Sequence, residues 1–199
     1  MKGDHPMAGN MVFAVNEDSV DFSNGWQTSA PLVSNALPIV LLWLQQTMVM
    51  GNMRNDAILR SNKPLLRLRR SALHYELIAR RPASPSFDIN DSDSLFASFK
   101  LSTVHGGTGD LFDFSSPGEV MSTLHGHYLM YMRTADNSRD YAFGFKFTRH
   151  AGNYFFDPNA GLFHYSKIDD LLLNLTYLNT TTYYDFLGGT FWYRQFILG

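Results

Sequence analysis

The stretch that decides the fold is Tyr154-Phe155-Phe156-Asp157-Pro158-Asn159-Ala160-Gly161-Leu162-Phe163, in the last quarter of the chain. Aromatic residues at both ends of this stretch are typical of strands, and Asp-Pro-Asn followed by Gly is a common turn composition. The stretch therefore predicts two strands joined by a tight turn. Its simplest interpretation is structural. The alternative is that Asp157 stands at a strand end in order to orient an imidazole.

The rest of the chain changes character at its middle. From about residue 126, aromatic and aliphatic residues fall into short runs separated by turn signals, which predicts strands at 127–133, 141–148, 154–156, 162–165 and 190–198. A helix is expected from 166 to about 178. Before residue 102 the apolar residues have helical spacing, which predicts helices at 35–50, 64–80 and 91–100, and a capping box at 116–119 predicts one more.

These patterns predict one α+β domain over residues 1–199, in which N-terminal helices pack on a C-terminal twisted antiparallel sheet. Residues 1–125 are expected to form the mainly helical half and residues 126–199 the mainly β half. The glycine-rich run at 105–109 lacks the Gly-Lys-Ser/Thr ending of a phosphate-binding loop, so we interpret it as a mobile loop.

Composition excludes several classes of protein. The 199 residues include 16 Phe, 10 Tyr and 3 Trp, enough aromatic side chains for a sizeable core, and no cysteine, so disulfides, cysteine zinc sites and iron–sulfur clusters are impossible. A net charge of −2 argues against nucleic acid as the main partner. The longest apolar run, 36–44, is too short for a membrane span, and the first residues do not have the pattern of a secretory signal.

Two histidines could carry chemistry. His125 and His127 share one face of the expected strand, which would suit a metal pair, but residues 129–133 offer no glutamate to complete such a site. His127 therefore remains either a structural histidine or a catalytic base, and we expect no metal and no cofactor. At the start of the first helix, free backbone N–H groups could support a nucleophile. Taken by itself, however, the segment Ser34 to Ala36 is typical of a helix cap.

Taken together, three segments resemble the YopT-like cysteine proteases, papain-fold effectors that bacteria deliver into host cells. In that family Gly-x-Cys starts a helix that carries Trp-Leu two turns later, Gly-His opens a strand, and Phe-Asp-Pro-Asn-x-Gly-x-Phe follows. Here Trp43-Leu44 fits the helix, Gly126-His127 fits the strand, and the stretch 156–163 fits the last motif. Counting back from Trp43 places the family's nucleophile at Ala36.

The resemblance implies a papain-like cysteine protease that attacks a host protein through a thiolate at position 36. His127 would be its base, Asp157 would orient the imidazole, and Gln27 would complete the oxyanion hole. We therefore expect the Ala36 methyl within about 5 Å of a ring nitrogen of His127. The same chemistry could serve a lysine fatty acyltransferase.

Two departures from the family pattern keep alternatives open. Alanine at position 36 fits an inactivated enzyme or a natural pseudoenzyme that only binds its partner, and Ser34 would be the nucleophile position if the register shifts by two. A strand-like run, 141–148, also separates His127 from Asp157, where the family has a short hairpin. Either this run is an insertion or another histidine, such as His125, takes the role.

The resemblance also suggests partners and a destination. Family members act on lipid-anchored GTPases or signalling kinases, so the expected substrate is a host protein of that range, reached after secretion by a bacterium. The helix at 64–80 and its exit gather basic side chains that could dock on an anionic membrane or an acidic partner: Lys63, Arg67, Arg69, Arg70, Arg80 and Arg81.

Overall fold

The computed structural model describes residues 9–14, 36–51, 93–108, 125–136, 139–148, 152–186 and 188–199. Gln27, the basic helix with Arg67 and Arg81, and the capping box at 116–119 lie outside these described residues. Their predicted roles therefore stay predictions.

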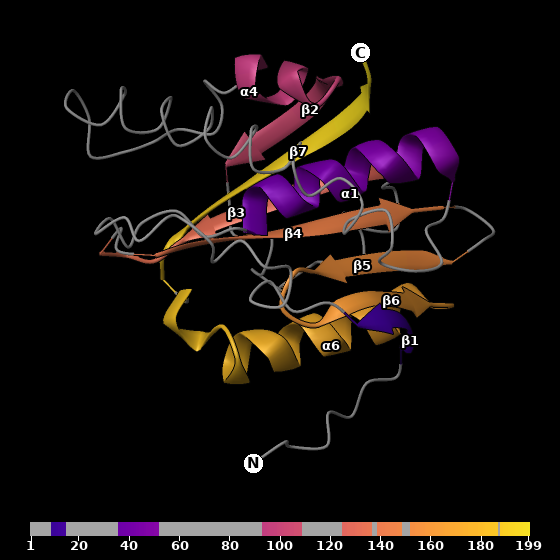
Figure 1. Ribbon diagram of the computed structural model, residues 1–199. Helices are drawn as coiled ribbons and strands as arrows, with labels where there is room; N and C mark the ends of the chain where they lie inside the picture. Colours follow the sequence, from indigo (N-terminus) through magenta and orange to yellow (C-terminus); the bar gives the residue numbers. More distant parts are fainter. Residues whose placement is uncertain are drawn as a thin grey trace, which may run out of the picture.

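A seven-stranded antiparallel sheet forms the centre of the described chain, in the order β1-β6-β5-β4-β3-β7-β2 (Figure 1). Its strands are β1 (Asn10–Ala14), β2 (Leu101–Thr108), β3 (Gly126–Arg133), β4 (Asp140–Phe147), β5 (Asn153–Asp157), β6 (Gly161–Tyr165) and β7 (Thr190–Leu198). The decisive stretch forms β5, its turn and β6, as the sequence predicts, because the Asp-Pro-Asn turn lets two aromatic strands pair directly.

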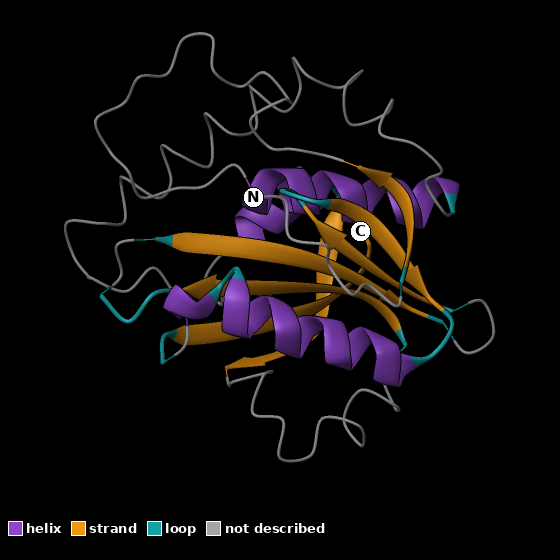
Figure 2. Cartoon of the chain, turned by 90° about the horizontal axis from the view of Figure 1, so that it is seen from below, coloured by secondary structure: helices purple, strands orange, loops and turns teal. Residues whose placement is uncertain are grey.

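Helices cover both faces of the sheet. Helix α1 (Ala36–Met50) lies over one face, along β4, and α6 (Ile168–Thr181) lies over the other, followed by the short η3 (Tyr184–Phe186) (Figures 1 and 2). Helix α4 (Asp93–Ser98) packs beside β2. Among the described helices, none is long and apolar enough to cross a membrane.

Helix α1 is buried on nearly all sides from Ala36 to Leu44, about two and a half turns, which is typical of a helix at the centre of a protein. Its contact with the sheet depends on ring stacking: the Trp43 and Phe156 rings stack with centroids 5.1 Å apart. Gly144 makes this possible, because a Cβ at that position would lie 2.6 Å from the Trp43 ring. Trp43 thus packs α1 against β4 and β5.

The α+β class is confirmed, but the division into halves is not. Strands β1 and β2 come from the half expected to be helical, and both sit at the edges of the sheet. The glycine-rich run predicted to be a mobile loop also lies largely in β2, where Gly106 and Gly107 pair with Arg194 and Tyr193 of β7. Pairing with a long neighbouring strand overrides the weak strand preference of glycine, which a local pattern cannot show.

Candidate functional site

Asp157, the last residue of β5, is the most completely paired polar side chain of the predicted site. The Tyr141 hydroxyl donates to its Oδ1 at 2.8 Å and the Tyr183 hydroxyl donates to its Oδ2 at 2.9 Å. The backbone N–H of Asn159 also donates to Oδ1, at 2.8 Å. The carboxyl group is buried, and donors from three separate segments converge on it.

Burial governs the ionisation of this cluster, which we call the Asp157 cluster: Asp157, Tyr141 and Tyr183. Loss of solvent raises the pKa of Asp157, and the hydrogen bonds from Asn159 and the two tyrosines partly oppose that rise. The same burial, together with the nearby carboxylate, raises the pKa of Tyr141 and Tyr183. Both tyrosines are therefore hydroxyl donors at neutral pH, and the cluster is a fixed hydrogen-bonded unit.

His127 lies elsewhere, near the start of β3. It pairs across the sheet with Lys146, and Lys146 pairs with Tyr154. Side chains directly opposite each other share a face and successive side chains alternate, so His127 shares its face with Tyr154 and Phe156, and Asp157 points to the other face. Three residues along the strands and two strands across separate His127 from Asp157, about 14 Å between Cα atoms.

The predicted pairing of His127 with Asp157 is therefore corrected. Helix α1 covers the His127 face through Trp43, whereas the Asp157 face is covered by α6 and the segment that carries Tyr183. The physical reason is the run 141–148: it forms β4, which stands between the two strands and sets their register.

The surroundings of His127 do not resemble those of a base in a catalytic triad. Burial and the positive charge of Lys146 lower the pKa of His127 to about 4, so the imidazole is neutral at pH 7. Its buried Nε2 atom makes no hydrogen bond. A carboxylate partner would raise this pKa instead.

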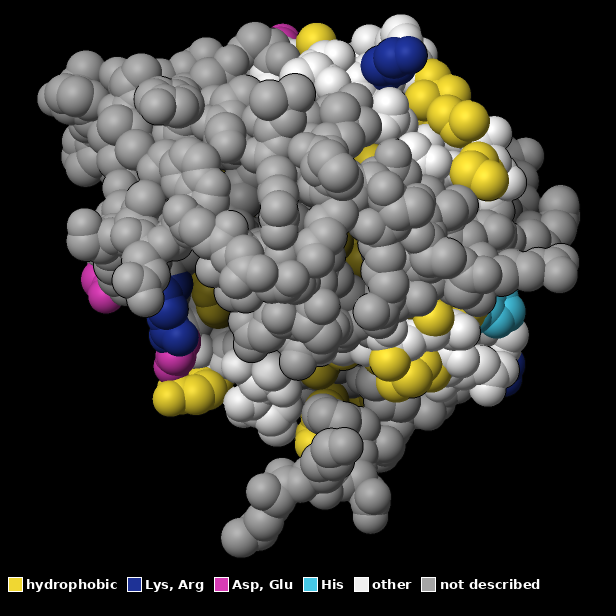
Figure 3. Space-filling view, in the orientation of Figure 1, with side chains coloured by type: hydrophobic (Ala, Val, Ile, Leu, Met, Phe, Trp, Pro, Cys, Tyr) yellow, Lys and Arg dark blue, Asp and Glu magenta, His cyan; other side chains and the backbone are white. Residues whose placement is uncertain are grey.

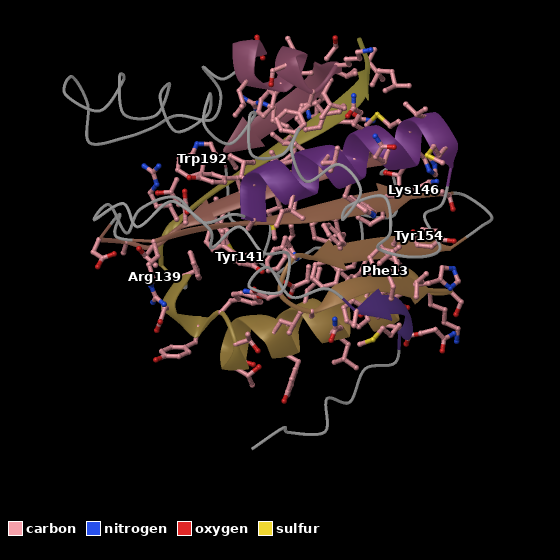
Figure 4. The ribbon with its side chains drawn as sticks, in the orientation of Figure 1. Phe13, Arg139, Tyr141, Lys146, Tyr154 and Trp192 are labelled. Carbon is pink, nitrogen blue, oxygen red and sulfur yellow. The ribbon has the colours of Figure 1, made fainter. Side chains whose placement is uncertain are left out.

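Ala36, the predicted nucleophile position, is the first residue of α1 and is fully buried. The first turn of α1 lies toward the end of the sheet at which β4 begins, where Tyr141 is labelled (Figures 1 and 4). His127 pairs with Lys146 near the opposite end of β4. The structure thus brings neither Ala36 and His127 nor His127 and Asp157 together, and the expected approach of Ala36 to the imidazole is not seen.

Tyr141 and Tyr183 are the site residues that sequence reasoning missed. Tyr141 is the second residue of β4, the strand that pairs directly with β5, and from there its side chain reaches the carboxyl group at the end of β5. A signal existed, because the strand-like run 141–148 was visible in the sequence. Tyr183, from the connection after α6, had no local signal.

Within the described part of the chain, no group of three or more His, Asp or Glu side chains could hold a metal ion.

Comparison with known proteins finds one informative likeness. No family model matches the chain, and no curated protein matches it. Among solved structures, the crystal structure of the Pseudomonas avirulence protein AvrPphB superposes with a TM-score of 0.58 at 15% sequence identity, over 82% of this chain and 92% of that chain. The α+β fold is thus papain-like, as in AvrPphB. At this identity the likeness concerns the fold alone.

Proposed function

We propose that this chain is a papain-like effector that binds a host protein without cleaving it. The observation that carries the proposal is the saturation of Asp157: two tyrosine hydroxyls and a backbone N–H occupy the oxygens that would otherwise orient an imidazole. The chain also has no cysteine, so it holds no thiol nucleophile. A protein with this fold that lacks a thiol nucleophile and a carboxylate free to orient an imidazole can still bind a partner protein through its surface.

The rival interpretation is a cysteine protease, or a lysine acyltransferase, whose nucleophile is replaced by Ala36. Thiolate chemistry needs a base within hydrogen-bond reach of the nucleophile and a group that orients the base. A cysteine at position 36 would supply the nucleophile only, because His127 sits in a different part of the sheet and Asp157 already has its donors. The geometry therefore favours binding over catalysis.

The proposed setting follows from the resemblance and from the fold shared with a Pseudomonas avirulence protein. The chain would be secreted by a bacterium and would act inside a host cell on a host protein. Lipid-anchored GTPases and signalling kinases are the range that the resemblance suggests. The predicted basic helix, with Arg67 to Arg81, would assist docking on an anionic surface.

Substitution of Ala36 by cysteine tests the proposal. A buried thiol without an imidazole partner keeps a pKa at or above the ordinary value of about 8.5, so Ala36→Cys should react with iodoacetamide at pH 6 no faster than free cysteine. The double variant Ala36→Cys/His127→Ala should behave identically. Rapid alkylation that is lost when His127 is replaced would refute the non-catalytic proposal and restore the original triad.

A second measurement addresses the wild-type chain directly. Host-cell lysate incubated with the wild-type protein should show no new protein N-termini and no newly acylated lysines by mass spectrometry. The matched control for background proteolysis is lysate incubated with the Trp43→Ala variant, which lacks the ring that packs α1 against the sheet. New N-termini that appear with the wild-type chain alone would contradict the proposal.

A further inference from the structure

Strand β2 is an edge of the sheet that pairs on one side only. Within the described residues β2 pairs with β7 on one side, and no strand lies on its other side. Edge strands in stable proteins usually carry charged residues or proline that prevent further pairing. The β2 sequence, Leu-Ser-Thr-Val-His-Gly-Gly-Thr, contains neither, and its protection against pairing is limited to a register shift between Thr103 and His105. Four successive side chains, Ser102 to His105, are exposed, so neither face of this part of the strand is covered.

The register shows which backbone groups point to the open side. The N–H of Gly199 donates to the carbonyl of Lys100 at 3.0 Å, so this pair is hydrogen-bonded. Because bonded and non-bonded pairs alternate in an antiparallel ladder, Leu101 and Thr103 turn their N–H and C=O groups away from β7. Beyond the irregularity at Val104, the same alternation along β7 directs the backbone groups of Gly106 and Thr108 outward.

A buried arginine lies beside this edge. Arg194 of β7 is opposite Gly106, and its side chain crosses over that glycine: a Cβ on Gly106 would overlap the guanidinium. Arg194 is 8% exposed, and its NH1 atom donates to the carbonyl of Tyr193 at 3.1 Å. Among the described residues no carboxylate pairs with it. A guanidinium binds a carboxylate through two parallel hydrogen bonds, so Arg194 is the group beside this edge that would favour an acidic side chain.

We infer that the partner protein adds an extended segment to the open edge of β2 and places an aspartate or glutamate against Arg194. The inference rests on the proposed binding function and names where and how the partner binds. Outward N–H and C=O groups of Leu101, Thr103, Gly106 and Thr108 would supply main-chain pairing, and Arg194 would supply selectivity for an acidic side chain.

Peptide selection tests this inference. A phage library of random ten-residue peptides is selected against the immobilised full chain, and the recovered peptides are synthesised and titrated by fluorescence anisotropy. The selected peptides should share one acidic position flanked by β-branched or aromatic residues. Their binding should slow amide hydrogen exchange at Leu101, Thr103 and Gly106. A selection that yields no binding peptide overturns the inference.

Two variants of one residue separate backbone pairing from side-chain contact. Thr103→Pro removes an outward N–H and leaves the bonds to β7 intact, so it should weaken peptide binding at least about tenfold, the effect of roughly one lost hydrogen bond. Thr103→Val keeps the N–H and should bind as the wild type does. Urea unfolding checks that both variants fold. Ser102→Pro, which removes a hydrogen bond between β2 and β7, gives the unfolding behaviour of a destabilised sheet for comparison. Equal binding by Thr103→Pro and wild type overturns the inference.

The acidic position is tested by a double-mutant cycle. Replacing the shared Glu of the peptide by Gln should weaken binding to the wild-type chain about tenfold and should have little effect on Arg194→Gln. An unchanged Glu preference in Arg194→Gln would exclude Arg194 as its partner. These results are independent of catalysis: if the wild-type chain cleaves a host protein, the proposed function fails while the Thr103 variants still decide the role of β2.

Discussion

The carboxyl group of Asp157 on the α6 face of the sheet and the Nε2 atom of His127 on the α1 face are both buried, but they differ in their hydrogen bonding. On the α6 face, Asp157 receives donors from β4, from its own turn and from the connection after α6. On the α1 face, the buried Nε2 atom of His127 has no hydrogen-bond partner, and neither has the indole N–H of Trp43. The difference teaches that the Asp157 carboxyl group is a structural element of the fold, whereas His127 leaves a buried polar atom unpaired.

Removal of Asp157 should have the largest effect on stability. Asp157→Ala leaves two buried tyrosine hydroxyls and a backbone N–H without an acceptor, which should lower the free energy of unfolding by about 3 to 5 kcal/mol. Urea denaturation followed by tryptophan fluorescence measures the loss. Asp169→Ala, an exposed aspartate in the first turn of α6, is the matched control and should cost about 0.5 kcal/mol. Similar losses in both variants would mean that the Asp157 cluster is not a stabilising unit.

The contrast between Asp157 and His127 also marks what the sequence could reveal. Alternating apolar runs and the Asp-Pro-Asn turn predict five of the strands and the position of Asp157 at a strand end, because those features depend on neighbours in the chain. Which side chain faces Asp157 depends on register, and register follows from the whole set of strand pairings. The sequence points to His127 because histidine is the usual partner of a catalytic carboxylate, but Tyr141, the second residue of β4, contacts Asp157 instead.

Strands β1 and β2 were missed for a related reason. Both lie at edges, where one neighbour and half-exposed side chains suffice, so their sequences need little alternation. The glycines of β2 serve a tertiary purpose, since Gly106 leaves room for the Arg194 side chain. The sequence around Gly106 does not indicate that Arg194 packs against it.

Acid should destabilise the α1 face through His127. The folded pKa, about 4, lies below the ordinary value of 6.5, so the unfolded chain binds a proton first as the pH falls. The contribution of neutral His127 to the free energy of unfolding is fully present above pH 6.5. It is lost as the pH falls from 6.5 to 4, by about 2 kcal/mol after allowance for partial solvent access. The raised pKa of Asp157 acts in the opposite direction at acidic pH, so wild type is compared with His127→Gln, in which only the first effect is absent. Parallel stability curves for the two proteins would show that the pKa of His127 is the same in the folded and the unfolded chain, which would contradict the prediction.

The smallest effect should come from the surface contact that lies next to the Asp157 cluster. Arg139, before β4, forms an ion pair with Asp185 of η3, and its guanidinium lies 5.8 Å from the centroid of the Phe186 ring. Figure 3 shows a basic and an acidic group in contact at the left edge of the molecule, the side on which Figure 4 labels Arg139. The same short element follows Tyr183, so two contacts could hold it against the sheet.

Burial decides between these contacts. The ion pair is exposed and screened by salt, whereas the Tyr183 hydroxyl meets a buried carboxylate at 2.9 Å. Arg139→Ala should therefore leave the urea midpoint unchanged at 0.15 M salt, roughly physiological ionic strength, and Tyr183→Phe should cost about 1 kcal/mol or more. If Arg139→Ala destabilises the protein as much as Tyr183→Phe does, the exposed ion pair holds η3 against the sheet. The hydrogen bond from Tyr183 to Asp157 would then follow from the position of η3 and would not determine it.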